Sequence, residues 1–223
     1  MGRPCTLGRI YMDELKRAYY EKRSKILLKN LHKRNFEAYY CKNKEEALEK
    51  ALSLIPEGAT VGWGGCMSCE QIGLLEAVRA GNYVAYDRDT CQTPDEKDAM
   101  MRKCLTADVF LTGANALSLS GEMVNIDGTA NRVAAICYGP ANVIVVVGMN
   151  KVCQDLEVAI DRAKNVAAPL NMGRFGFQTP CNVTGSCGDC VGEECICNQM
   201  LITRHCRVPG RIKFILVGED LGL

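Results

Sequence analysis

Residues 108–148 read DVFLTGANALSLSGEMVNIDGTANRVAAICYGPANVIVVVG, and this stretch contains four short apolar runs separated by clusters of glycine, asparagine and threonine. Apolar runs bounded by such residues predict strands that end in polar loops. The predicted strands are 109–111, 122–126, 132–137 and 143–147. Strands that are apolar on both faces are typical of a sheet covered on both sides by helices. The segment therefore predicts the core of a sheet and one wall of a site.

Within this stretch, residues 121–128 (GEMVNIDG) alternate between polar and apolar and are bounded by glycines. This pattern favours a β-hairpin. We expect its polar side chains, together with the two polar residues that follow, to lie close to one another: Glu122, Asn125, Asp127, Asn131 and Arg132.

The rest of the chain alternates predicted helices and strands. A helix begins at Met12, with Leu15, Tyr19, Ile26 and Leu31 as its apolar positions. Further strands are expected at 36–41, 60–65, 83–86 and 211–218, and further helices after Asn43, around 68–81, at 94–105 and after Gly148 to about Asn165. This rhythm predicts a three-layer α/β fold, a mostly parallel sheet flanked by helices. We expect an N-terminal helical extension over 1–35 and one α/β domain over 36–223, with a cysteine-rich insertion at about 171–207.

A glycine-rich turn, Gly62-Trp63-Gly64-Gly65, joins a predicted strand to a helix, and Ser68 with Gln71 has the spacing of a capping box. Bare amides at such a turn favour an anion. Alternatively, the glycines serve only to make the turn tight. If the turn binds an anion, a pocket is expected between this turn and the 108–148 segment. Its candidate catalytic carboxylates are Glu122 and Asp127. The candidate ligand-binding residues are Gly64, Gly65, Cys66, Ser68, Thr112, Gly113, Asn115, Asn125, Asn131 and Arg132.

Six of the fourteen cysteines crowd into residues 181–206, in TPCNVTGSCGDCVGEECICN and just beyond it. A C-x2-C pair with further cysteines nearby is typical of a metal site in an intracellular chain. The spacing does not separate an iron–sulfur cluster from zinc, and a metal-free loop is the remaining alternative. The other cysteines, scattered singly or in one loose pair, are expected to be small core residues.

Composition excludes several functional classes. A net charge of +1 gives no electrostatic reason to expect a nucleic-acid partner, whose recognition needs a concentrated basic surface, and the basic-rich region 16–34 is interpreted as a solvated helix face. No apolar run reaches the ~20 residues of a membrane span, and the N-terminus has no signal-peptide core. We therefore expect a cytoplasmic protein.

The segment TGANALSLSGEMVNIDGTANRVAAICYGP, followed by NVIVVVG and by NVAAP at 165–169, resembles the LUD (lactate utilization) domain family. That family is related to ribose-5-phosphate isomerases, glucosamine-6-phosphate deaminases and CoA transferases, so the resemblance implies an isomerase/CoA-transferase-like fold. It also implies that the glycine turn belongs to a ligand pocket. Finally, it favours Cys181, Cys187, Cys190 and Cys197 as the metal ligands.

Three functions compete. The first is participation in the oxidation of lactate or a related organic acid, with a Cys-ligated Fe4S4 cluster that exchanges electrons with partner subunits. The second is an isomerase- or transferase-like enzyme acting on a phosphorylated ligand through Glu122 or Asp127, although the Ser-Glu-Asn-Gly run of CoA transferases is absent. The third is a non-catalytic ligand-binding subunit with structural zinc.

Overall fold

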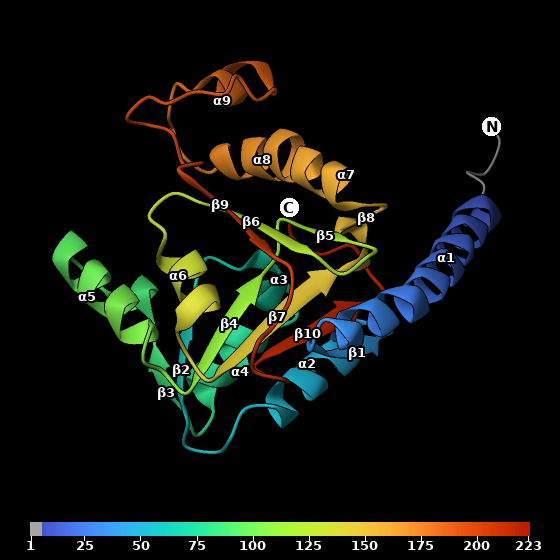
Figure 1. Ribbon diagram of the computed structural model, residues 1–223, viewed down its shortest axis with the longest axis horizontal. Helices are drawn as coiled ribbons and strands as arrows, with labels where there is room; N and C mark the ends of the chain where they lie inside the picture. Colours follow the sequence, from blue (N-terminus) through green and yellow to red (C-terminus); the bar gives the residue numbers. More distant parts are fainter. Residues whose placement is uncertain (1–5) are drawn as a thin grey trace.

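The computed structural model describes residues 6–223, with side chains from Met12 onward. Its centre is a six-stranded sheet in which every neighbouring pair is parallel. The strand order is β1 (Glu37–Cys41), β10 (Ile212–Val217), β7 (Asn142–Gly148), β4 (Val109–Gly113), β2 (Thr60–Trp63) and β3 (Val84–Tyr86). The predicted α/β class and mostly parallel sheet are confirmed (Figure 1).

One face of this sheet packs against α2 (Lys44–Ser53), α3 (Met67–Gln71) and α4 (Leu74–Ala80). The predicted helix after Asn43 is confirmed: the Asn43 side chain accepts a hydrogen bond from the Glu46 amide at 2.9 Å. Every side chain of β4 is buried, as expected for a strand covered on both faces. The neighbouring strand β7 (NVIVVVG) is rich in apolar β-branched residues and is also buried from Val143 onward.

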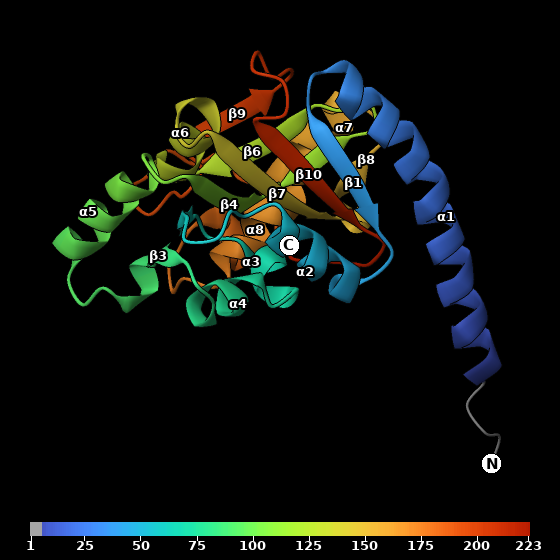
Figure 2. The same ribbon diagram turned by 90° about the horizontal axis from the view of Figure 1, so that it is seen from below.

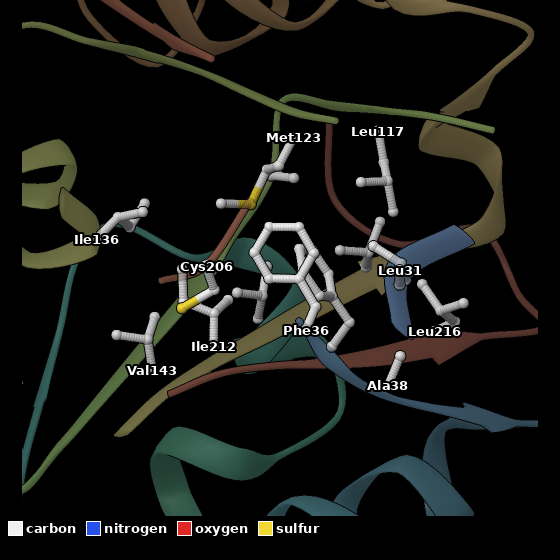
Figure 3. Close-up of a cluster of buried hydrophobic side chains, with 14 of the residues drawn as sticks. Leu31, Phe36, Ala38, Leu117, Met123, Ile136, Val143, Cys206, Ile212 and Leu216 are labelled. Carbon is white, nitrogen blue, oxygen red and sulfur yellow. The ribbon is translucent and has the colours of Figure 1, made fainter. Parts of the chain in front are cut away.

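The predicted hairpin is confirmed, but its strands belong to a second sheet. That four-stranded sheet has the order β8 (Val152–Cys153), β5 (Ala116–Ser118), β6 (Met123–Asp127) and β9 (Gln199–Thr203). We expected the 122–126 strand to join the main sheet, and that was wrong. Figure 3 shows the reason: Leu117 and Met123 of the small sheet lie over Phe36, which directly precedes β1, and over side chains of the large sheet, so the two sheets share a core.

The predicted strand over 132–137 is also wrong, because this segment is a helix, α6 (Asn131–Tyr138). A short apolar run does not distinguish a strand from a buried helix. Here Val133 and Ile136, three residues apart, are both buried on one face. Ala130, with φ at 65°, turns the chain into the helix in the left-handed region.

Helix α1 (Thr6–Lys33) is confirmed as a helix, although it begins at Thr6 and not at the expected Met12, and the sequence identified its buried face incorrectly. Leu31 is buried as expected, whereas Leu15, Tyr19 and Ile26 are about half exposed. Tyr20 and Leu27 take their place in the core. Figure 2 shows why: the first half of α1 extends away from the sheet, so only its second half has a surface to pack against.

The remaining helices enclose the two sheets. The sequence-predicted capping box at Thr93 is present at the start of α5 (Pro94–Cys104), after a short turn η1 (Arg88–Thr90). After β7 come η2 (Met149–Lys151), α7 (Leu156–Arg162), a π-turn η3 (Ala163–Ala167) and α8 (Ala168–Met172), which cover the small sheet (Figure 1). The predicted helix after Gly148 thus begins at an Asp155 cap and continues past Asn165.

The cysteine-rich segment lies between α8 and β10, as predicted, and contains α9 (Pro180–Thr184) and β9. Its second half is ordered by pairing, because β9 runs antiparallel to β6. Among residues 6–223, no helix has the length and apolar character required to cross a membrane.

Candidate anion-binding site and cysteine segment

A cavity of about 430 Å³ opens where β2, β4 and β7 end. Carboxyl ends of parallel strands are where open α/β sheets build their sites. The turn after β2 and the loop after β4 form two of its walls, and the residues after β6 form a third. From the predicted pocket, the cavity is lined by Gly65, Cys66, Ser68, Gly113, Asn115, Asp127, Asn131 and Arg132.

Gly64 contributes through close approach rather than as a lining residue. A Cβ placed on Gly64 would lie 3.1–3.2 Å from the Cβ, Cγ and Cδ atoms of Arg132. The missing side chain therefore lets Arg132 lie directly against the turn. The structure brings together the turn and Arg132, as the predicted shared pocket requires.

Two other predicted residues support the cavity from behind. Asn125 is fully buried and donates to the carbonyl of Gly113 at 3.0 Å. Thr112, also fully buried, donates to the same carbonyl at 3.3 Å. Neither side chain lines the cavity, and both hold the β4 loop in place.

Arg132 is fixed from several directions. Its Nη2 donates to Asn115 Oδ1 at 3.2 Å and to the Ile126 carbonyl, and its Nε lies 3.4 Å from Asp127 Oδ2. Asn115 is held in turn, because its Oδ1 accepts from the Ile126 amide at 2.8 Å. A guanidinium fixed in this way presents a preorganised planar donor to a carboxylate or phosphate.

Asp127 presents one oxygen without a hydrogen-bond donor. Its Oδ1 accepts from the amides of Thr129 and Ala130, at 3.2 Å each. Its Oδ2 is buried and, among the described residues, has no hydrogen-bond partner. Buried acceptors are normally satisfied; Oδ2 has only the long ion-pair contact of 3.4 Å to Arg132 Nε, so it retains an unused acceptor position beside that guanidinium.

Glu122, the other predicted catalytic carboxylate, lies away from the cavity. It forms an ion pair with Arg34 and accepts hydrogen bonds from the hydroxyls of Ser118 and Ser120. Burial alone raises the pKa of Glu122, but the two hydroxyls and the Arg34 charge outweigh it, so the pKa lies below its ordinary value. Such a carboxylate is already paired and is poorly suited to act as a base.

The sequence reading missed Lys151, which lines the cavity from the turn after β7. Its side chain is buried and its Nζ donates to Ser68 Oγ at 3.2 Å. Burial lowers the pKa of Lys151 to about 8, although the neighbouring Cys66 opposes the shift. Its position just after the carboxyl end of an apolar strand was the signal that could have identified it.

Two further cations, Arg88 and Arg174, also line the cavity. With Arg132 and Lys151 they make its charge predominantly positive, since Asp127 is the sole carboxylate side chain among the described lining residues. The arrangement can hold a small anion.

The predicted capping box at Ser68 and Gln71 is wrong. Helix α3 begins at Cys66, whose Sγ accepts from the Cys69 amide at 3.3 Å. The Ser68 hydroxyl oxygen instead accepts a hydrogen bond from Lys151 Nζ. The three-residue spacing of a helix cap is present, but it runs from Cys66 to Cys69 and not from Ser68 to Gln71.

The cysteine segment approaches the cavity at its end, where Cys197 is one of the lining residues. Asn198 donates to the Gly128 carbonyl at 3.0 Å, and Lys164 pairs with Asp189 at 3.1 Å. These contacts join the segment to the loop after β6 and to η3.

The thiols of this segment lie near one another. Burial raises the pKa of Cys197, and Cys195, Cys181, Cys187 and Cys190 raise it further. Each described cysteine is a free thiol. Over residues 6–223, no three His, Cys, Asp or Glu side chains are placed so as to hold one metal ion, so the sulfurs are adjacent without converging on a point.

The fold and site together define an α/β protein with a positively charged cavity at the carboxyl ends of its strands. The sequence model of the LUD domain matches residues 25–217, and the chain belongs to the LUD domain family. Comparison with curated proteins gives no significant match.

Two solved structures are similar. A DUF162 family protein from Deinococcus radiodurans is 14% identical, with 90% of this chain and 97% of that chain covered and a TM-score of 0.49. Ribose 5-phosphate isomerase A from Neisseria gonorrhoeae is 16% identical, with 61% of this chain and 70% of that chain covered and a TM-score of 0.34. With TM-scores this low, neither likeness bears on the function of this chain.

Proposed function

We propose that this protein takes part in the utilization of lactate or a closely related 2-hydroxy acid, which it binds in the cavity beside Arg132. The observation that carries the proposal is the pairing of a fixed guanidinium with an unsatisfied carboxylate oxygen. Arg132 Nε and Asp127 Oδ2 are 3.4 Å apart, so a small molecule held by the remaining N–H groups of Arg132 would lie beside Oδ2. A 2-hydroxy acid has a carboxylate for the first and a hydroxyl for the second.

Lys151 strengthens this reading. A second, buried cation near Ser68 gives the carboxylate another partner, and charge-assisted hydrogen bonds are stronger than neutral ones. A phosphorylated ligand would use the same cations. It would, however, bring its additional negative charge near the Asp127 carboxylate, which a singly charged hydroxy acid does less.

The cysteine segment is the second part of the proposal. Cys181, Cys187, Cys190 and Cys197 are proposed to hold an Fe4S4 cluster, with zinc as the alternative. Four neighbouring thiols in a glycine-rich segment match the donor chemistry of either metal centre, and ordering of the segment by metal would draw their sulfurs together. A bound iron–sulfur cluster would supply one-electron transfer, which points to redox partner subunits. Because Cys197 lines the cavity, such a centre would adjoin the bound acid.

The isomerase-like alternative now depends on Asp127 alone, because Glu122 is paired with Arg34. A ligand-binding subunit with structural zinc remains the other alternative. The metal analysis described below tests the zinc alternative.

Ligand binding is tested by calorimetric titration with L-lactate and with propionate, which lacks the hydroxyl. We expect lactate to bind more tightly than propionate, and Asp127→Asn to reduce that difference. Arg132→Gln should weaken both ligands by at least tenfold. Lys103→Gln, which changes an exposed cation on α5 outside the cavity, is the matched control. Equal binding of lactate by wild type and Arg132→Gln would overturn the proposed site.

The metal is tested by the absorption spectrum and by iron, sulfide and zinc analysis after anaerobic purification. We expect iron and sulfide in the wild type and their loss in Cys190→Ser. Cys153→Ser, in the buried strand β8, is the control and should keep the metal. The same metal content in the wild type and Cys190→Ser would refute the assignment, and zinc without iron would favour the structural alternative.

A further inference from the structure

A second pair of cysteines lies in the wall of the cavity, separate from the cysteine segment. Cys66 and Cys69 form a C-x2-C motif at the start of α3, and their Sγ atoms are 3.0 Å apart. The sequence analysis named Cys66 as a pocket residue and left Cys69 among the expected core cysteines, and it assigned no redox role to either. Sulfurs at this distance need to approach by about 1 Å more to reach the ~2.05 Å of a disulfide.

The two thiols differ in access. Cys66 lines the cavity, whereas Cys69 has no exposed surface and lies behind it, with its Sγ 3.6 Å from the Thr112 carbonyl. A Cβ on Gly113 would lie 3.1 Å from Cys66 Sγ, so the glycine leaves room for that sulfur beside β4. A small molecule in the cavity can therefore reach Cys66 and not Cys69.

The two thiols also differ in electrostatic environment. Burial raises the pKa of Cys66, but hydrogen bonds from the Cys69 thiol and amide and the charges of Lys151 and Arg132 bring it below its ordinary value. Burial and the neighbouring Cys66 keep the pKa of Cys69 well above its ordinary value. The thiolate is the nucleophilic form of cysteine, so Cys66 is the attacking sulfur of the pair.

We propose that Cys66 and Cys69 form a redox-active dithiol, which a small hydroperoxide that enters the cavity oxidises to a disulfide. The Cys66 thiolate attacks one peroxide oxygen, the O–O bond breaks, and Cys66 becomes a sulfenic acid as hydroxide leaves. The Cys69 sulfur then attacks the Cys66 sulfur, an S–S bond forms, and the sulfenic oxygen leaves with the Cys69 proton as water. The two sulfurs lose two electrons in total and the peroxide gains two.

Hydroperoxide is the oxidant that this geometry fits. Cys66 is only 7% exposed, which excludes a bulky disulfide from in-line attack on its sulfur. Low-pKa cysteines beside a resolving cysteine are the ones most readily oxidised by peroxide. The remaining described cysteines of the α/β body lack such a partner, since no other hydrogen bond between two thiols is found there.

The sequence provides a direct assay. Trypsin cleaves after Lys50 and Arg79, and the peptide 51–79 contains Cys66 and Cys69 as its only cysteines. The peptide 104–132 contains Cys104 alone, a buried thiol that serves as an internal reference. Reduced full-length protein would be treated with one equivalent of hydrogen peroxide, denatured, alkylated with iodoacetamide and digested with trypsin. The masses of the two peptides would then be measured by mass spectrometry.

We expect peptide 51–79 from oxidised protein to carry no alkyl group and to have the mass of the reduced, unlabelled peptide minus two hydrogens. Cys66 and Cys69 should become resistant to alkylation at least ten times faster than Cys104. Cys69→Ser should instead trap the Cys66 sulfenic acid, detected as a dimedone adduct. Cys66→Ser should leave Cys69 fully alkylated, and serine is itself a good helix N-cap, so the start of α3 is retained. The control Cys104→Ser should oxidise at 66–69 as the wild type does.

The readout needs no lactate and no metal, so it is independent of the proposed function. Peptide 51–79 with both alkyl groups, at a peroxide dose that already oxidises the exposed Cys137, would overturn the proposal. A disulfide from Cys66 to Cys197 in place of Cys69 would overturn it as well. Near-ultraviolet circular dichroism of both serine variants establishes that they are folded, and the wild-type result stands without them.

Discussion

Replacement of Glu122 by glutamine tests whether this carboxylate is structural rather than catalytic. The side chains of Arg34 and Glu122 keep 22% and 11% of their exposure, so their ion pair lies largely out of water. The substitution preserves shape but leaves the Arg34 charge with the carbonyls of Ser120 and Arg204, at 2.7 and 2.8 Å. Loss of one partner of a buried ion pair costs about 3–5 kcal/mol. Because two acceptors remain, we expect a loss of about 3 kcal/mol in the free energy of unfolding.

Urea denaturation at pH 7 measures this loss as a lower midpoint with an unchanged slope, and thermal unfolding should shift by about 6–12 °C for a chain of this size. The lowered pKa of Glu122 means that its contribution is present above the unfolded-state pKa and is lost as pH falls through the folded-state pKa. The stability difference between the wild type and Glu122→Gln should therefore disappear in acid. Glu49→Gln, an exposed glutamate with no ion pair among the described residues, is the control.

Two results would refute this reasoning. The first is equal stability of the wild type and Glu122→Gln at pH 7. The second is a loss of lactate binding in Glu122→Gln without a loss of stability, since that outcome would return Glu122 to the binding site.

Three further predictions concern the cavity and one helix end. Lactate affinity should fall as pH rises from 7 to 9, because Lys151, with a pKa of about 8, loses its charge; titrations at constant ionic strength measure this, and Lys151→Met should bind weakly at both pH values. Gly64→Ala should weaken lactate binding about tenfold, or ~1.4 kcal/mol, because the new Cβ displaces Arg132; unchanged affinity would show that the close approach is not needed. Asn43→Ala should lower the free energy of unfolding by ~1 kcal/mol through loss of the α2 cap, and an unchanged urea midpoint would contradict this.

Local signals were sufficient for most of the large sheet. Runs such as Asn142–Gly148 are apolar throughout and end at glycine, which leaves few alternatives to a buried strand. The caps at Asn43 and Thr93 likewise depend on residues three positions apart. Where structure depended on distant packing, the sequence was not enough. Residues 132–137 are apolar in either secondary structure, and the burial of α1 depends on where the sheet edge ends.

The site divides in the same way. Gly65, Cys66 and Gly113 follow strands, and the carboxyl ends of parallel strands meet, so their proximity could be predicted. Glu122 appeared to belong with them because it is polar and near Asp127 in sequence. Its actual partner, Arg34, is 88 positions earlier in the chain, and no local pattern indicates that pairing.

The place of β10 in the sheet has a consequence for biosynthesis. This strand lies between β1 and β7, so residues 37–41 gain their sheet partner only after residues 212–217 have been made. Until then the edge of β7 and the apolar face of β1 are both open, and unpaired strand edges are the surfaces through which chains aggregate. A ribosome that pauses within the cysteine-rich segment would hold the nascent chain in this split state. The open edge of β7 and the apolar face of β1 are thus the surfaces that a chaperone would have to cover until β10 is available.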